Sequence, residues 1–205
     1  MIGVLINLLG SVKHRIETIR LKRRWKTLRT AGMRIGFDVW LPGSTWIDSE
    51  YCFLIEIGDH CGFGEECMIL AHDAQMEEFL DATRLGRVVI HPSSHIGART
   101  TILPGVEIGP RTIVGANSLV SRSLPPNTVC AGNPARVICT LDEYVAKHAS
   151  RLEGANILPV GAFRDRASLH ARQAAILAAT AKGRTYVVGG HSEEDCGGGT
   201  TPRTS

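Results

Sequence analysis

Apolar residues return every six positions through the middle of the chain. The first set is Ile57, Phe63 and Ile69; after an interruption the same step resumes and runs through Ile90, Ile96, Ile102, Ile108, Val114 and Val120. At 43% apolar content, nine matches in nine positions have a chance probability on the order of 0.0005, before the choice of register and break is counted. The period therefore reflects structure.

Two further regularities accompany the period. Glycine follows the apolar residue at five positions, which suits a tight corner: Gly58, Gly64, Gly97, Gly109 and Gly115. The fourth residue after each apolar residue of the period is usually small, as in Cys61, Cys67, Ser94, Thr100, Thr112 and Ser118. A unit of one short strand and one corner buries its apolar side chain only when units stack, so the pattern predicts a hexapeptide β-solenoid.

Three such units make one coil of a triangular prism, so 57–74, 90–107 and 108–125 are predicted to be coils. Residues 34–38 are expected to begin an irregular first coil. The interruption at 75–89 is polar and charged, which favours a loop ejected from the prism beside the residues that precede it. The predicted β-helix domain spans 35–140.

The flanking segments differ in pattern from the prism. Residues 1–34 predict an amphipathic helix, because Leu5, Leu9, Val12, Ile16 and Ile19 share one face and basic residues occupy the other. This helix could cover the end of the core, lie on anionic lipid or dock on a polyanionic substrate. Residues 141–188 predict a C-terminal helical extension, with a helix at about 164–182, and 189–205 a disordered tail.

Composition narrows the function classes. A length of 205 residues suits one main domain, and a net charge of +3 gives no reason to expect a nucleic acid partner. The six cysteines are scattered without a CxxC pair, which fits neither a zinc ribbon nor a disulfide framework. No apolar run reaches the roughly 18 to 20 residues that span a bilayer. We expect a cytoplasmic protein, with peripheral contact at the inner face of the membrane through the basic helix as an option.

The repeat and the segments on both sides of the interruption resemble the hexapeptide-repeat acyltransferases, in particular the sugar and polysaccharide O-acetyltransferase branch with the galactoside and maltose acetyltransferases. The resemblance covers roughly 35–148. It is carried by the Ile57-Gly58-Asp59 repeat, the element Leu70 to Ala74, the run Ile102 to Arg122, the triplet Pro125-Pro126-Asn127 and the closing segment Ala131 to Arg136. The resemblance implies an all-β core that is a left-handed parallel β-helix, a homotrimer, and acetyl-CoA in a groove between adjacent prisms.

The resemblance also implies a catalytic base at His72, which ends a coil immediately before the interruption. A hydroxyl is a weak nucleophile, and a base that takes its proton as the new bond forms accelerates the reaction about 100-fold or more. Histidine suits this role because its ordinary pKa is near 6.5. Asp73 is a candidate to orient the imidazole, although neighbours in a strand point to opposite sides. The alternative is a corner histidine bonded to a backbone carbonyl.

Matching residue by residue places the acetyl-CoA contacts of the family on five positions: Ala98, Ala116, Ser121, Arg122 and Arg136. The backbone N–H of Ala98 would stabilise the negative charge that develops on the thioester oxygen. The two arginines would meet coenzyme phosphates, although Arg122 stands where the family usually has lysine. A family arginine is Cys139 here, a departure in the nucleotide contacts. No metal is expected.

These features predict transfer of an acetyl group from acetyl-CoA to a hydroxyl of a sugar or polysaccharide precursor. N-acetylation of an amino sugar nucleotide is a close alternative. A second class, a metal-dependent hydratase resembling the γ-type carbonic anhydrases, would need His72, His91 and His95 as ligands, at a spacing unlike that family's. A third possibility is a non-catalytic β-helix scaffold.

Overall fold

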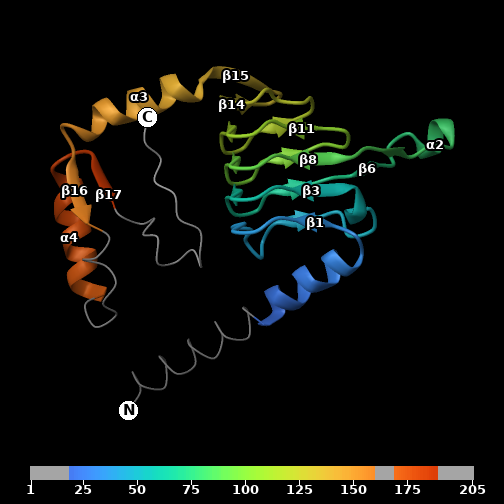
Figure 1. Cartoon of the computed structure of the whole chain (residues 1–205), viewed down its shortest axis with the longest axis horizontal. Helices are drawn as coiled ribbons and strands as arrows, with labels where there is room; N and C mark the ends of the chain where they lie inside the picture. The colour runs from blue at the N-terminus through green and yellow to red at the C-terminus, as the bar shows by residue number, and fades with distance from the viewer. Residues whose placement is uncertain (1–18, 160–168, 189–205) are drawn as a thin grey trace, which may run out of the picture. The chain divides into compact units, whose positions relative to one another are not determined.

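The computed structural model of the chain describes residues 19–159 and 169–188 (Figure 1). The chain divides into two compact units, Met1–Leu141 and Asp142–Ser205. The apolar face predicted before residue 19 and the disordered tail predicted at 189–205 lie outside the described residues. The first unit contains the prism and the second contains the C-terminal extension.

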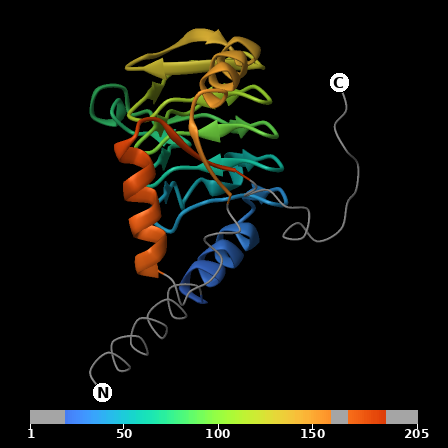
Figure 2. The ribbon, with the colours of Figure 1, turned by 90° about the vertical axis from the view of Figure 1, so that its left-hand side faces the viewer.

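Three parallel sheets form the faces of the prism. The first sheet contains β1 (Arg34–Ile35), β3 (Ile55–Ile57), β8 (Val88–Ile90) and β11 (Glu107–Ile108). The second contains β4 (Gly62–Phe63), β9 (His95–Ile96), β12 (Ile113–Val114), β14 (Thr128–Gly132) and β15 (Ala135–Thr140), the last of which pairs antiparallel with β14. The third contains β2 (Trp46–Ile47), β5 (Met68–Ile69), β10 (Thr101–Ile102) and β13 (Leu119–Val120). The predicted left-handed parallel β-helix is confirmed, with successive coils stacked along its axis (Figure 2).

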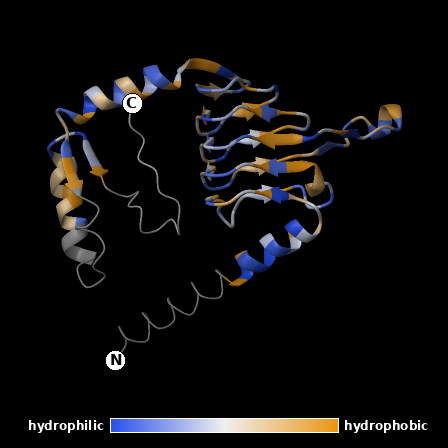
Figure 3. Cartoon of the chain, viewed as in Figure 1, coloured by the Kyte–Doolittle hydropathy of each residue, from blue (hydrophilic) through white to orange (hydrophobic). Residues whose placement is uncertain are grey.

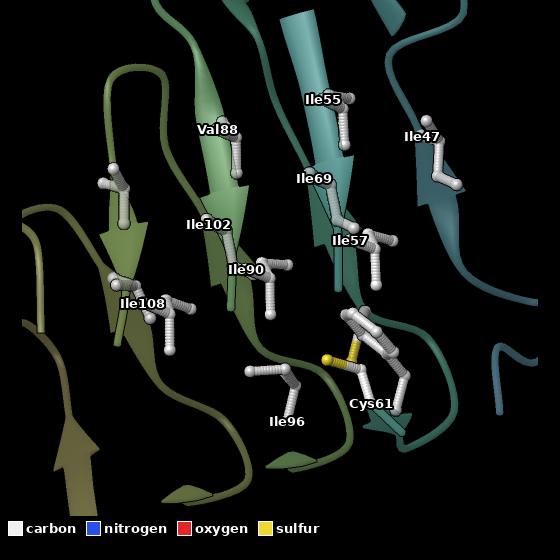
Figure 4. Close-up of a cluster of buried hydrophobic side chains, with 14 of the residues drawn as sticks. Ile47, Ile55, Ile57, Cys61, Ile69, Val88, Ile90, Ile96, Ile102 and Ile108 are labelled. Atoms are coloured by element: carbon white, nitrogen blue, oxygen red, sulfur yellow. The ribbon is translucent and has the colours of Figure 1, made fainter. Parts of the chain in front are cut away.

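The nine apolar residues of the six-residue period fill the interior of the prism. Each is at most 3% exposed, and the isoleucines of successive coils stack in rows inside it (Figure 4). Burying one such side chain contributes roughly 1.5 to 3 kcal/mol. The small polar residues of the period are buried at corners, where their hydroxyls reach backbone carbonyls; Ser94 Oγ donates to Gly109 O at 2.8 Å and Thr112 Oγ1 to Pro125 O at 2.8 Å.

The first coil, residues 34–54, is more regular than predicted. Ile35, Leu41 and Ile47 continue the six-residue step, and the last two are buried. The coil pairs with the second at an offset of 22 residues, as in Trp46 with Met68, four more than the 18 of a regular coil. The extra residues fall after β2, where a 3₁₀ turn, η1, covers Cys52–Leu54.

The predicted loop leaves the prism at the same corner, one coil further on. Its two arms are β6 (His72–Asp73) and β7 (Arg84–Leu85), which pair antiparallel, and α2 (Glu77–Leu80) forms the tip (Figure 1). The loop ends before residue 88 and not at 89, because Val88 and Val89 belong to β8, pair with β3 and are buried.

A helix over 19–30 covers the open end of the first coil, so the covering role considered for the N-terminal helix is found in its described part. Leu28 is 5% exposed and belongs to the core, and Trp25 packs against it. The guanidinium of Arg24 donates to the carbonyls of Gly43 and Thr45. In the described part of the chain, no helix combines the length and apolar character needed to cross a bilayer.

The second unit adds a small sheet to the helices expected there. Most of α3 (Leu141–Leu152) belongs to this unit, which continues with β16 (Asn156–Pro159), α4 (Leu169–Ala181) and β17 (Thr185–Val188). The strands β16 and β17 pair in parallel, so the segment 156–188 has β-α-β connectivity, whereas the sequence predicted a helical extension without strands over 141–188. Asn156 joins helix to sheet, since its side-chain amide donates to Ala179 O at 3.1 Å.

Candidate active site

His72 lies where the second coil gives way to the projecting arm. It follows β5 and begins β6, and its side chain is 29% exposed. Its imidazole Nδ1 is hydrogen-bonded to a carboxylate oxygen, Oδ2, of Asp48 from the first coil. The side chain of Asp48 is only 2% exposed. The pair therefore joins a buried carboxylate to a partly accessible imidazole.

Three backbone N–H donors converge on the carboxylate of Asp48, in addition to the imidazole of His72. Its Oδ2 accepts the N–H groups of Ala71 and His72 at 3.1 Å each, and its Oδ1 accepts the N–H of Tyr51 at 3.3 Å. Burial alone would raise the pKa of Asp48, but the hydrogen bonds from His72, Tyr51 and Ala71 outweigh it and hold the pKa below its ordinary value. Asp48 is thus an anion at neutral pH.

An anionic carboxylate can only accept hydrogen bonds, so the proton of a neutral imidazole sits on Nδ1 and donates to Asp48. The lone pair of a neutral His72 then lies on Nε2. Among the described residues, no hydrogen-bond partner of this nitrogen is found. Nε2 is consequently free to accept a proton from a bound molecule.

Tyr51 supports the imidazole from a second side. Its ring centroid lies 4.9 Å from that of His72, with the planes inclined by 44°. Tyr51 belongs to the four-residue insertion of the first coil, and His72 stands at the start of the larger insertion of the second. Because both insertions use one corner of the prism, the structure brings together two side chains that the six-residue repeat does not relate.

The sequence analysis did not name Asp48, and it weighed Asp73 in that role. The structure gives Asp73 a different partner: its Oδ1 accepts the N–H of Gln75 at 3.0 Å, inside the first turn of the arm. A signal for Asp48 does exist in the sequence. Ile35, Leu41 and Ile47 keep the six-residue step, and Asp48 follows Ile47 just as Leu70 follows Ile69 in the next coil.

The five residues matched to acetyl-CoA contacts lie at three places. Ala98 and Ala116 stack at the corner between the second and third sheets, where Ala98 O accepts the N–H of Asn117 at 2.9 Å. Ser121 and Arg122 follow β13 at the corner that holds His72, two coils further along. Arg136 lies exposed in β15. Within one copy of the prism, His72 and Ala98 therefore occupy different corners, separated by the width of the third sheet.

The backbone at Ala98 is tightly placed. A Cβ added at Gly64, one coil below, would lie 2.4 Å from the nitrogen of Ala98. The N–H of Ala98 has no acceptor among the described residues. This N–H is therefore held in place by close backbone packing.

The histidines that the hydratase alternative needs as metal ligands lie in different surroundings. His91 Nε2 lies 3.6 Å from Glu107 Oε2, and the His95 side chain projects from β9 on the second sheet. In the part of the chain that the structure describes, no group of three or more histidine, cysteine, aspartate or glutamate side chains is arranged to hold a metal.

Comparison with known proteins gives the family. A family model described as bacterial transferase hexapeptide (six repeats) matches residues 87–122. WcaF of Escherichia coli (strain K12), provisionally named a colanic acid biosynthesis acetyltransferase, is 31% identical over 140 residues, which cover 56% of this chain and 74% of WcaF. The chain belongs to the hexapeptide-repeat acetyltransferase family.

Other relatives of this hexapeptide-repeat protein match over shorter stretches or at lower identity. YvoF of Bacillus subtilis (strain 168), provisionally named an acetyltransferase, is 40% identical over 89 residues, 43% of this chain. The chain spans about half the length of YvoF, 49%, and about three quarters of WcaF. The structure of a maltose O-acetyltransferase from Clostridium difficile 630 superposes with a TM-score of 0.47 at 26% identity, covering 58% of this chain and 75% of that one.

Proposed function

We propose that this protein transfers the acetyl group of acetyl-CoA to a hydroxyl of a sugar or polysaccharide precursor, with His72 as the general base. The observation that carries the proposal is the Asp48–His72 pair, in which a buried carboxylate fixes the proton on Nδ1 and leaves Nε2 unbonded. Family membership supplies acetyl transfer as the reaction type. The name of WcaF, which refers to colanic acid, supports a carbohydrate acceptor.

The reaction proceeds by direct transfer. Nε2 of His72 takes the proton of the acceptor hydroxyl while the hydroxyl oxygen attacks the carbonyl carbon of the thioester. Negative charge develops on the carbonyl oxygen and is stabilised by the N–H of Ala98. The C–S bond then breaks, the acetyl ester leaves with the acceptor, and the imidazolium returns its proton to the sulfur of CoA. Asp48 stabilises the imidazolium between these steps.

The binding of acetyl-CoA would use the remaining matched residues. Arg122 and Arg136 are exposed cations that can pair with the coenzyme phosphates. Ala116 lies at the corner of Ala98 and Ser121 at the corner of His72, so the pantetheine arm would contact both where these corners of two copies meet. The conclusion is that the donor occupies the outside of the coils, along the axis of the prism.

This assignment requires more than one copy of the chain. His72 and Ala98 lie at different corners of one prism, so one copy does not place base and oxyanion donor around a single thioester. Packing the His72 corner of one copy beside the Ala98 corner of the next would do so, and repeating this contact around a threefold axis closes a homotrimer. We therefore place the active site between copies.

A decisive experiment measures CoA release with acetyl-CoA and a panel of sugars offered in matched hydroxyl and amino forms. We expect turnover with a hydroxyl acceptor and a loss on the order of 100-fold or more in kcat for His72→Ala. Wild-type turnover by His72→Ala would overturn the assigned base. Turnover confined to the amino sugars would favour N-acetylation of an amino sugar nucleotide, and failure to bind CoA in a calorimetric titration would favour a scaffold.

The shared site has its own test by complementation. His72→Ala and Gly64→Ala disable opposite corners, since the added Cβ would displace Ala98. Mixing the two inactive variants under exchange of subunits should restore part of the activity, because some interfaces then join two intact corners. Absence of recovery in verified mixed oligomers would place the site within one copy.

A further inference from the structure

One end of the β-helix concentrates positive charge. Residues 19–34, which comprise the described helix, the turn after it and the first residue of β1, contain seven lysines and arginines and no acidic residue. Five of these cations project from the helix as exposed side chains: Arg20, Lys22, Arg23, Lys26 and Arg29. Figure 3 shows this helix as mostly hydrophilic beneath the coils.

The cations are exposed because the opposite face of the helix packs against the β-helix. Trp25 and Leu28 pack against the core, and Arg24 is bound to two carbonyls of the first coil. Among the described residues, none of the five exposed cations forms a salt bridge. Their charge is therefore not neutralised within the part of the molecule that the structure describes.

The adjoining first coil adds a girdle of aromatic rings. Phe37 is 63% exposed, Trp40 72%, Trp46 46% and Phe53 55%. Phe37 lies after the first sheet, Trp40 on the second, Trp46 on the third and Phe53 in the turn that leads back to the first. The rings thus surround the coil that the basic helix covers. Among the described phenylalanines and tryptophans, only Phe79, at the tip of the arm, is otherwise exposed to a similar degree.

Cations and aromatic rings at one level, two of the rings being the amphipathic indoles of Trp40 and Trp46, match the surface of an anionic bilayer. Each lysine or arginine near such a surface strengthens binding about fivefold, and tryptophan favours the headgroup region. We propose that the helix 19–30 and the first coil dock this protein on anionic lipid, with the helix against the headgroups and the aromatic girdle at the interface. The attachment is peripheral and goes beyond the proposed transfer reaction.

The composition of residues 1–9 agrees with this partner. Residues 1–9 contain seven apolar residues and no charged residue. Apolar sequence beside a basic segment is typical of chains that lie on membranes.

The test uses the full chain with vesicles of phosphatidylcholine alone and of phosphatidylcholine mixed with phosphatidylglycerol. All three tryptophans, Trp25, Trp40 and Trp46, lie in the helix and first coil, so their fluorescence reports on this end. We expect sedimentation with the mixed vesicles only, release by high salt, and a blue shift of the tryptophan emission on binding.

A charge-reversal pair with a matched control sharpens the test. Lys22→Glu with Lys26→Glu should weaken binding to the mixed vesicles at least about tenfold. Lys147→Glu with Lys182→Glu changes the net charge equally at exposed positions of the other unit and should bind as the wild type does. Acetyl transfer to a soluble acceptor should be unchanged in both, which separates this proposal from the proposed function.

Three outcomes would overturn the proposal. They are equal binding to neutral and anionic vesicles, equal loss in the two charge-reversal pairs, and a tryptophan shift with soluble polyphosphate as large as with vesicles. The last would assign the surface to a soluble polyanion.

Discussion

Asp48 and His72 are neighbours in space because two coils of different length meet at one corner of the prism. The carboxylate of Asp48 is buried below the imidazole and accepts hydrogen bonds from Nδ1 of His72, from the backbone N–H of His72 and from the backbone N–H of Ala71. The position of the ring is thereby tied to the backbone at the root of the arm.

Asp48→Asn should lower kcat on the order of 100-fold and leave the KM for acetyl-CoA nearly unchanged. The amide cannot stabilise the imidazolium as a carboxylate does, and the matched acetyl-CoA contacts lie elsewhere. Steady-state kinetics of CoA release measure the effect. Asp73→Asn is the control, since the one hydrogen bond found for the Asp73 carboxylate among the described residues comes from the N–H of Gln75; an equal loss in that variant would remove the special role of Asp48.

Asp48 should also stabilise the fold in a pH-dependent manner. Its pKa is lowered in the folded protein, so its ionised form contributes stability above its unfolded pKa of about 4. That contribution is lost as pH falls through the unfolded pKa toward the lower folded one. The difference in free energy of unfolding between wild type and Asp48→Asn, from urea melts, should shrink below about pH 4. A difference that stays constant down to acidic pH would contradict the ionised assignment.

Tyr51 should act through its ring and not through its hydroxyl. Because a packed aromatic pair contributes about 0.5 to 1.5 kcal/mol, Tyr51→Ala should lower kcat by about two- to tenfold. Tyr51→Phe keeps the contact with His72 and should restore kcat to the wild-type value. Kinetics of both variants at matched folded concentration provide the measurement. A loss in Tyr51→Phe as large as in Tyr51→Ala would instead assign a role to the hydroxyl.

Gly64→Ala should destabilise the prism and disturb the backbone at Ala98. The new Cβ would lie 2.4 Å from the nitrogen of Ala98, and such overpacking costs about 1 to 3 kcal/mol. Gly154→Ala is the matched control, because nothing lies within 4 Å of its added Cβ. Thermal unfolding compares the two, and a midpoint for Gly64→Ala equal to that of the control would show that the coils can separate at this corner.

The sequence predicts the prism because each six-residue unit repeats the same burial requirement. Ile57, Ile90 and Ile108 are each covered only when a neighbouring coil packs against them. The six-residue period identifies these positions from the local sequence alone. The same reasoning singles out His72, since the place where a period breaks is visible in the sequence. It also shows the basic face of the N-terminal helix.

Contacts between coils were decided only by the tertiary structure. Whether Asp48 contacts His72 depends on the four residues added after β2. A hydrophobic period does not predict the backbone conformation of such an insertion. The separation of His72 from Ala98 likewise follows from which sheet each residue adjoins. The sequence by itself therefore determined the repeating architecture and the position of the break, because both are local burial patterns. The partner of His72 and the division of the site between two corners required three-dimensional packing, because they join residues whose spacing the repeat does not set.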